Sequence, residues 1–284
     1  MEVSPTLPGD LRPEVPVLAI SGWRVVGAAA SGTSHERLGM PCQDALAYQA
    51  GEHSLLVALS DGAGTAERSQ HGAQTAVQAA LDALIAALDE GLPAEQAGWQ
   101  DMLCAAFAAA RLALESLAEI EEQPLRDYAA TLSLVVASAE RLAVAQLGDG
   151  AVVTGESPDK LFLVNQAQRG EYANETYFLT QEDALEQVQV SVYEKAVNFL
   201  AVMSDGLTRL AIKLPDNEPH LPFFQPLFAF VTHADDEEQA SLHLVDFLTS
   251  ERVCARTDDD KSLVLAVRLP GPELEAEREG TESV

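Results

Sequence analysis

The chain has 284 residues, of which 47% are hydrophobic and 22% charged, so it is long enough to bury a core of ordinary globular size. Its 45 acidic residues outnumber its 17 basic residues and give a formal net charge of −28. This imbalance argues against nucleic acid as the main partner, because phosphate backbones attract basic surfaces. It suits a protein that attracts cations.

The chain ends and the cysteines indicate a cytoplasmic protein, which is expected to be a monomer. Residues 1–22 are acidic and proline-rich, without the basic and apolar regions of a signal peptide, and are expected to be flexible. Residues 269–284 are expected to form a disordered acidic tail. No run of 18 apolar residues predicts a membrane segment. The 3 cysteines are widely spaced and predict reduced thiols rather than disulfides or a zinc site.

The first part of the ordered region predicts strands followed by a pair of helices. Short apolar or β-prone runs predict the strands, and long alanine-rich segments with apolar residues at helical spacing predict the helices. Gly91 and Pro93 separate the two helices. The expected elements are strands at 23–30 and 54–60 and helices at 69–88 and 94–120.

The second part predicts many short strands and one further helix. The strands are expected at 131–137, 141–147, 151–154, 161–164, 188–192, 199–204 and 263–267, and the helix at 235–248. The proline- and phenylalanine-rich segment 215–232 gives no clear assignment. Because strands and helices do not alternate regularly, the order favours an α+β layered sandwich over a doubly wound parallel sheet.

Aspartates stand at the ends of several expected strands. Asp61, Asp149 and Asp205 each follow an apolar run and precede a glycine, and Asp259 stands just before the last strand. Asp44 follows Cys42-Gln43. Carboxylates held at strand ends can converge on one edge of a sandwich and bind Mg²⁺ or Mn²⁺, which prefer oxygen ligands. Two such ions could activate a water and clamp a phosphoryl group. The alternative is that each Asp-Gly pair only makes a turn.

A set of short motifs follows one another along the chain. They are Ser34-His35, Pro41-Cys42-Gln43-Asp44-Ala45, Ser60-Asp61-Gly62-Ala63-Gly64, Ala130-Thr131-Leu132, Gly148-Asp149-Gly150, Ser204-Asp205-Gly206 and Asp259-Asp260-Lys261-Ser262-Leu263. With these motifs in this order, residues 23–268 resemble the metal-dependent type 2C (PPM-type) Ser/Thr protein phosphatases, in particular a bacterial branch. The whole set is specific, whereas each motif alone is weak.

The resemblance implies a fold and a reaction. The fold would be a four-layer α-β-β-α sandwich, in which two antiparallel sheets are flanked by helix pairs, formed by residues 23–268. The reaction would be hydrolysis of phosphoserine or phosphothreonine by direct attack of a metal-bound water, without a phosphoenzyme. The cofactors would be two Mn²⁺ or Mg²⁺ ions, with a third, weaker site. The partners would be a phosphorylated protein substrate and a cognate Ser/Thr kinase.

The resemblance also implies roles for individual residues. Asp61 would bridge the two ions, the Gly62 carbonyl would bind one of them, and Asp44 would act directly or through a bound water. Asp205 and Asp259 would complete the site. Asp149, together with Asp205, would hold the third ion.

Several residues depart from the family pattern. Gln43 replaces a common glutamate, Ala63 replaces a histidine proposed as general acid, and Asp260 replaces an asparagine. The usual phosphate-binding arginine is absent from the position near Gly39, which leaves His35 and Arg37 as substitutes. His35 would bind phosphate or donate a proton, or be an ordinary loop histidine. Arg37 would clamp phosphate or be a solvated loop charge.

Two other functions remain open at this stage. The departures at Gln43 and Ala63 are compatible with a catalytically weak or inactive binding module. A hydrolase of small phosphoesters would need a basic or aromatic pocket, for which the sequence gives no clear signal. Retention of Asp44, Asp61, Asp205 and Asp259 favours the active protein phosphatase.

Overall fold

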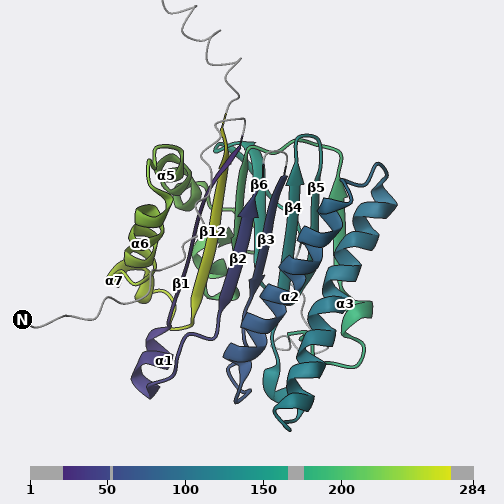
Figure 1. The fold of residues 1–284 in the computed structure, drawn as a ribbon. Coiled ribbons are helices and arrows are strands. Elements are labelled where there is room, and N and C mark those ends of the chain that lie inside the picture. The colour runs from purple at the N-terminus through teal and green to yellow at the C-terminus, as the bar shows by residue number, and fades with distance from the viewer. Residues whose placement is uncertain (1–21, 52–53, 166–175, 270–284) are drawn as a thin grey trace, which may run out of the picture.

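A computed structural model describes residues 22–51, 54–165 and 176–269, which fold into two stacked antiparallel sheets (Figure 1). Sheet A has the strand order β1 (Trp23–Ala30), β12 (Lys261–Arg268), β9 (Phe199–Met203), β6 (Ala151–Ser157) and β7 (Lys160–Leu163). Sheet B has the order β2 (Ala45–Ala50), β3 (Ser54–Ser60), β4 (Leu132–Ser138), β5 (Leu142–Leu147) and β8 (Gln189–Tyr193).

A pair of helices covers the outer face of each sheet. Helices α2 (Ser69–Asp89) and α3 (Gln96–Ile120) pack on sheet B, and α5 (Leu221–Thr232) and α6 (Glu237–Leu248) pack on sheet A. A third apolar core fills the space between the sheets. The expected four-layer α-β-β-α sandwich is therefore confirmed.

The central strands are apolar on both faces because both faces are covered. In β4 every residue is buried. Leu134 and Val136 pack toward the helices, whereas Val135 and Ala137 pack between the sheets, as the alternation of side chains along a strand requires. Burial on both faces turns the usual alternating pattern into a continuous apolar run.

Several shorter elements surround this frame. The expected strand at 54–60 and the strand at 23–30 have the bounds of β3 and β1, whereas the segment 215–232 folds largely as α5. The remaining short elements are α1 (Thr33–Leu38), η1 (Leu125–Tyr128), η2 (Ala184–Gln187), η3 (Asp205–Leu207), α4 (Thr208–Ala211), β10 (Ile212–Lys213), β11 (Glu218–Pro219) and α7 (Glu251–Cys254).

The expected flexible segment 1–22 and disordered tail 269–284 lie outside the described residues, apart from Gly22 and Leu269. Leu269 donates its N–H to the Gly22 carbonyl at 3.0 Å, beside the paired strands β1 and β12. Among the helices that the structure describes, none combines the length and the apolar character needed to cross a membrane. The cysteines at 42, 104 and 254 are free thiols.

Helix α2 approaches the η1 turn closely at Gly72, next to the segment that leads into β4. A Cβ atom added to Gly72 would overlap the carbonyl oxygen of Tyr128, which is main chain and cannot rotate away. This close contact fixes α2 against the segment that continues to Ala130 and Thr131.

We expect Gly72→Ala to destabilise the protein by about 1–3 kcal/mol, because an added methyl group in a closely packed position forces the backbone apart. The melting temperature should fall by roughly 2–10 °C. Gly51→Ala is a matched control, because a Cβ at that exposed position lies no closer than 3.6 Å to its neighbours. An unchanged melting temperature for Gly72→Ala would contradict this account of the α2–η1 contact.

Candidate metal centre

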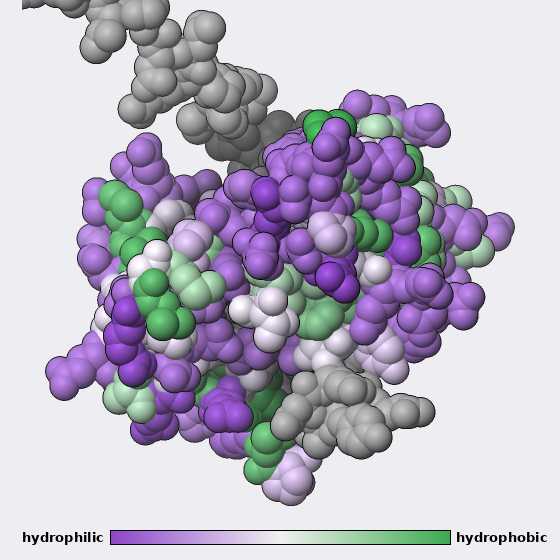
Figure 2. Space-filling model, turned by 90° about the horizontal axis from the view of Figure 1, so that it is seen from below, coloured by the Kyte–Doolittle hydropathy of each residue, from purple (hydrophilic) through white to green (hydrophobic). Residues whose placement is uncertain are grey.

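The aspartates predicted from the sequence gather at one edge of the sandwich. Strands β3, β5 and β9 end at this edge, and β12 begins there, because β4 and β12 run antiparallel to their neighbours. Figure 2 views the molecule from this end, where hydrophilic side chains form most of the surface. The antiparallel pairing therefore brings together residues that are more than a hundred positions apart in the sequence.

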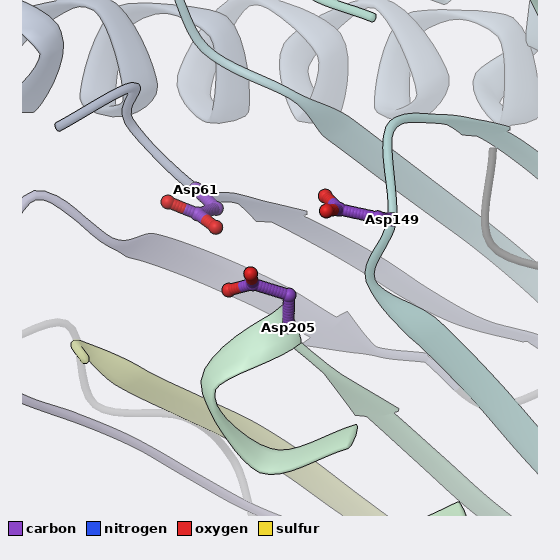
Figure 3. A group of neighbouring side chains, drawn as sticks. All are labelled: Asp61, Asp149 and Asp205. Carbon is purple, nitrogen blue, oxygen red and sulfur yellow. The ribbon is translucent and has the colours of Figure 1, made fainter. Parts of the chain in front are cut away.

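Three carboxylates point toward one another at this edge (Figure 3). Asp61, Asp149 and Asp205 each offer an oxygen, and these oxygens lie within 4.8 Å of one another. Oxygen-only donor sets of this kind suit Mg²⁺ and Mn²⁺. The donor chemistry of the described residues therefore fits a divalent-cation site.

Asp61 is held in place by Thr131. The Asp61 N–H donates to Oγ1 of Thr131 at 2.9 Å, and the Thr131 N–H donates to the Asp61 carbonyl at 2.8 Å. Burial, followed by the nearby charges of Asp44 and Asp205, raises the pKa of Asp61 well above its ordinary value. A bound cation would relieve this repulsion, because an opposite charge favours the ionised carboxylate.

Gly62 closes the backbone around Asp61. Its N–H donates to the Gln43 carbonyl at 3.2 Å, and a Cβ would lie 2.8 Å from the carbonyl oxygens of both Gln43 and Ser69. Only glycine fits between these two main-chain segments without displacing one of them. Gly62 lines the pocket in front of Asp61, where its main chain is close to the carboxylates.

Asp44 is more deeply buried than Asp61, Asp149 and Asp205. Its side chain is buried, and Oγ of Ser204 donates to its Oδ2 at 2.7 Å. Burial and the charges of Asp260 and Asp205 raise its pKa to about 7, although the hydrogen bond from Ser204 opposes that shift. Asp44 lies outside the group of three converging carboxylates, but close enough for its charge to raise the pKa of Asp61.

Asp205 and Asp149 face each other from the turns after β9 and β5. Burial, with the Asp149 charge next in importance, raises the pKa of Asp205 to about 6. Oγ1 of Thr208 donates to the Asp205 carbonyl at 2.8 Å, and Oγ1 of Thr176 donates to Oδ2 of Asp149 at 2.8 Å. A local hydrogen bond therefore holds the turn of Asp205, and a bond from a distant part of the chain holds the carboxylate of Asp149.

The two consecutive acids before β12 have different surroundings. Asp259 is exposed and lines the pocket, and its Oδ1 accepts the N–H of Asp260 at 2.9 Å. Asp260 is buried and accepts main-chain N–H groups from Gly32 at 2.6 Å and Gln43 at 2.5 Å. Asp260 therefore joins the last strand to the segments before and after α1.

The two basic candidates, His35 and Arg37, also have different surroundings. His35 is buried, its Nδ1 lies 2.9 Å from Oδ1 of Asp260, and it lines the pocket. Arg37 is exposed, and its Nε donates to the Thr33 carbonyl at 2.8 Å within α1. The structure brings His35 to the aspartates and leaves Arg37 outside the pocket.

A pocket of about 190 Å³ is lined by His35 and by the acids Asp61, Asp149, Asp205, Asp259 and Asp260, whereas Asp44 lies outside its lining. Besides the acids and His35, its walls include Gln43, Ala63, Thr131 and Phe178. Such a pocket offers carboxylates for cations, and one histidine for a phosphoryl group or its leaving oxygen.

Comparisons with known proteins show the family of this chain. A family profile described as protein phosphatase 2C matches residues 31–249. The chain belongs to the protein phosphatase 2C family. A curated relative named serine/threonine-protein phosphatase 3, from Escherichia coli strain K12, is 36% identical over 253 residues, which cover 86% of this chain and 98% of the relative.

Solved structures of the protein phosphatase 2C type share the fold. A structure described as a bacterial serine phosphatase has a TM-score of 0.59 at 14% identity, and the match covers 86% of this chain and 97% of that one. The serine/threonine phosphatase Stp1 from Staphylococcus aureus has a TM-score of 0.59 at 13% identity, with coverage of 90% and 100%. At such identities the likeness shows the fold alone.

Sequence reasoning missed the role of Asp260 and understated those of Thr131 and Ser204. Thr131 and Ser204 stand inside the protein phosphatase 2C motifs, but nothing in the sequence shows that their hydroxyls hold the acids. Asp260 belongs to a run of three aspartates, where sequence alone gives no sign of which side chain turns inward.

We expect Asp205→Asn to stabilise the metal-free protein. The raised pKa of Asp205 means that the folded state holds a proton more tightly than the unfolded state, so this contribution to stability is present below about pH 4 and is lost as the pH rises through about 6. In EDTA at pH 7.5 the variant should gain on the order of 1 kcal/mol after allowance for solvent screening, a rise of about 2–4 °C. The gain should shrink toward pH 4.

Calorimetry in EDTA between pH 4 and 8 measures this difference, with Asp101→Asn on the exposed side of α3 as the control. Added Mn²⁺ should stabilise the wild type more than Asp205→Asn, because a ligand that binds only the folded state raises its stability. A variant that is less stable than the wild type at every pH in EDTA would refute the repulsion between these carboxylates.

Proposed function

We propose that this chain is a metal-dependent phosphatase that hydrolyses phosphoserine and phosphothreonine in proteins. The observation that supports this most directly is the convergence of Asp61, Asp149 and Asp205 in one pocket, in a chain of the protein phosphatase 2C family. The Escherichia coli relative, by its name, acts on the same class of substrate. The phosphatase domain would be residues 23–268.

In this proposal the ions are two Mn²⁺ or Mg²⁺. Asp61 and the Gly62 carbonyl hold them, Asp44, Asp205 and Asp259 complete the site, and Asp149 contributes with Asp205 to a third, weaker site. When bound, these ions lower the pKa of a coordinated water and neutralise the charge on the phosphoryl oxygens. The protein would contribute carboxylates that hold the ions in fixed positions. The reaction would be direct attack of water on phosphorus, without a phosphoenzyme.

His35 is the group that would donate a proton to the leaving oxygen. Its Nδ1 lies 2.9 Å from Oδ1 of Asp260 without forming a hydrogen bond, and the ring lines the pocket, so Nε2 is the nitrogen proposed to meet the substrate. A histidine oriented in this way can donate a proton to the departing serine or threonine oxygen, which is too basic to leave unprotonated. This would replace the histidine that the family usually carries where Ala63 stands. Binding of the phosphoryl group is the alternative role for His35, and Arg37 is the weaker candidate for it because it is bonded within α1.

The other two hypotheses receive less support. An inactive binding module is disfavoured because all the proposed carboxylate ligands are present and gathered at one edge. A small-phosphoester hydrolase is disfavoured because the Escherichia coli relative is named a serine/threonine-protein phosphatase. The proposal further includes a cytoplasmic monomer and a Ser/Thr kinase that phosphorylates the same substrates.

We expect the purified protein with Mn²⁺ to hydrolyse a phosphothreonine peptide and p-nitrophenyl phosphate, and EDTA to abolish both activities. Asp61→Asn should lower kcat/KM by at least about a hundredfold, because it removes the proposed bridging ligand. Phosphate release measures the rates, and isothermal titration with Mn²⁺ measures ion binding. Absence of activity with Mn²⁺, Mg²⁺ and Co²⁺ would favour the binding-module hypothesis.

We expect His35→Ala to lower the rates with the two substrates by different factors. Loss of a proton donor should lower kcat for the phosphothreonine peptide by roughly a hundredfold. The effect on p-nitrophenyl phosphate should be much smaller, because p-nitrophenolate leaves without a proton. An equal rise of KM for both substrates, with kcat retained, would instead show that His35 only binds phosphate. Arg37→Ala, measured in parallel, tests the other candidate for that role.

A further inference from the structure

A second and larger pocket adjoins the candidate metal centre. It has a volume of about 690 Å³, and Asp149, Thr176, Asp205 and Asp259 line both pockets. The smaller pocket holds the groups proposed for chemistry, whereas the larger one has room for side chains next to the reacting residue. A substrate whose phosphoryl group lies in the first pocket would therefore have room for its neighbouring residues in the second.

Two arginines stand on the wall of the larger pocket. Arg209 is on α4, four residues after Asp205, and Arg256 follows α7, three residues before Asp259. The α4 helix is tied to the centre by the hydrogen bond from Thr208 to the Asp205 carbonyl. Arg256 donates its main-chain N–H to the Val253 carbonyl at 2.8 Å. Both arginines are therefore carried by short structured segments directly connected to proposed metal ligands.

Both guanidinium groups are available to a ligand. Arg209 and Arg256 are exposed, and neither forms a side-chain hydrogen bond or ion pair with any residue in 22–51, 54–165 or 176–269. Arginines elsewhere commonly have partners: Arg68 pairs with Glu121 and Arg111 with Glu115, each at 2.9 Å. The larger pocket is also lined by four aspartates, Asp149, Asp205, Asp258 and Asp259, yet neither arginine pairs with one of them in the described part of the chain.

The same pocket has an apolar side. Leu163 and Ile212 line it, and Leu214 lines it with 65% of its surface exposed. A pocket with two cationic groups and an apolar wall suits an extended peptide whose side chains are partly acidic and partly apolar.

We propose that this pocket binds the residues that flank the phosphorylated side chain, and that Arg209 and Arg256 select substrates with Asp or Glu there. This inference rests on the proposed phosphatase function. The net charge of −28 does not oppose it strongly, because exposed charges more than about 8–10 Å apart are largely screened at physiological salt. Of the four aspartates that line the pocket, Asp149, Asp205 and Asp259 are proposed metal ligands, whose charge the ions would offset. The remaining acid, Asp258, then stands against two arginines.

The test uses three phosphothreonine peptides that differ only in the flanking residues, which are Glu, Ala or Lys. The wild type with Mn²⁺ should have a kcat/KM for the Glu peptide about fivefold above that for the Ala peptide, as expected for exposed ion pairs. The Lys peptide should be the poorest substrate, and the preference should decline as salt is raised.

Substitution of the arginines should remove the preference. In Arg209→Gln/Arg256→Gln the ratio of kcat/KM for the Glu and Ala peptides should fall to about one, while Arg209→Lys/Arg256→Lys should keep most of it. Arg126→Gln is the matched control, because Arg126 is 86% exposed on η1 and lines neither pocket. Melting curves establish that the variants are folded; should the double variant unfold, each single variant should show part of the loss.

Two results would overturn the inference: a wild type without preference for the Glu peptide, or a double variant with the preference intact. Failure of the proposed function would look different, because the wild type would then hydrolyse none of the three peptides. Fluorescence anisotropy of the labelled peptides with wild-type protein then decides the inference by itself. A lower Kd for the Glu peptide than for the Ala peptide would support it, and equal Kd values would exclude it.

Discussion

Repulsion between buried carboxylates is the constraint on which the rest of this structure depends. Burial and mutual charge raise the pKa values of Asp44, Asp61 and Asp205 together, so their ionised forms destabilise the fold. Such a cluster persists only where the surrounding framework is rigid. Here that framework is two sheets whose central strands are buried on both faces, each covered by a helix pair. The apolar layers thus supply the stability that the charged edge removes.

One buried carboxylate organises the segments around the cluster. The Asp260 carboxylate accepts hydrogen bonds from the main-chain N–H groups of Gly32 and Gln43 and lies next to His35. The main-chain carbonyl oxygen of Asp260 leaves no room for a side chain at Gly206. Gln43 stands where a glutamate is common in the family. Its contacts to Asp260 and to Gly62 use its main chain, so they do not depend on whether the side chain is Gln or Glu.

The fold could be predicted well where both faces of a strand are buried, because the sequence then shows an unbroken apolar run, as in β3. Helix α5 could not, since Pro226 stands inside it, where proline normally breaks a helix. Packing of Phe224 and Phe228 against sheet A stabilises it instead. The candidate site was predictable as a set of strand-end acids. The difference between Asp259 and Asp260 was not, because it depends on where β12 begins its pairing with β1. The two arginines gave no signal, since each stands alone in the sequence.

The acids that converge come from both sheets, and this links the candidate site to the stability of the whole sandwich. Asp61 follows β3 of sheet B, Asp205 follows β9 of sheet A, and Asp149 lies in the turn that crosses from β5 to β6. Gly148 allows that crossing with φ +119°, a conformation that other residues rarely adopt. A cation bound between these groups would therefore hold the two sheets together at one edge, while the apolar core between them holds the remainder. The position of one sheet on the other then determines the geometry of the metal centre, so a packing change between the sheets would alter the centre without touching any ligand.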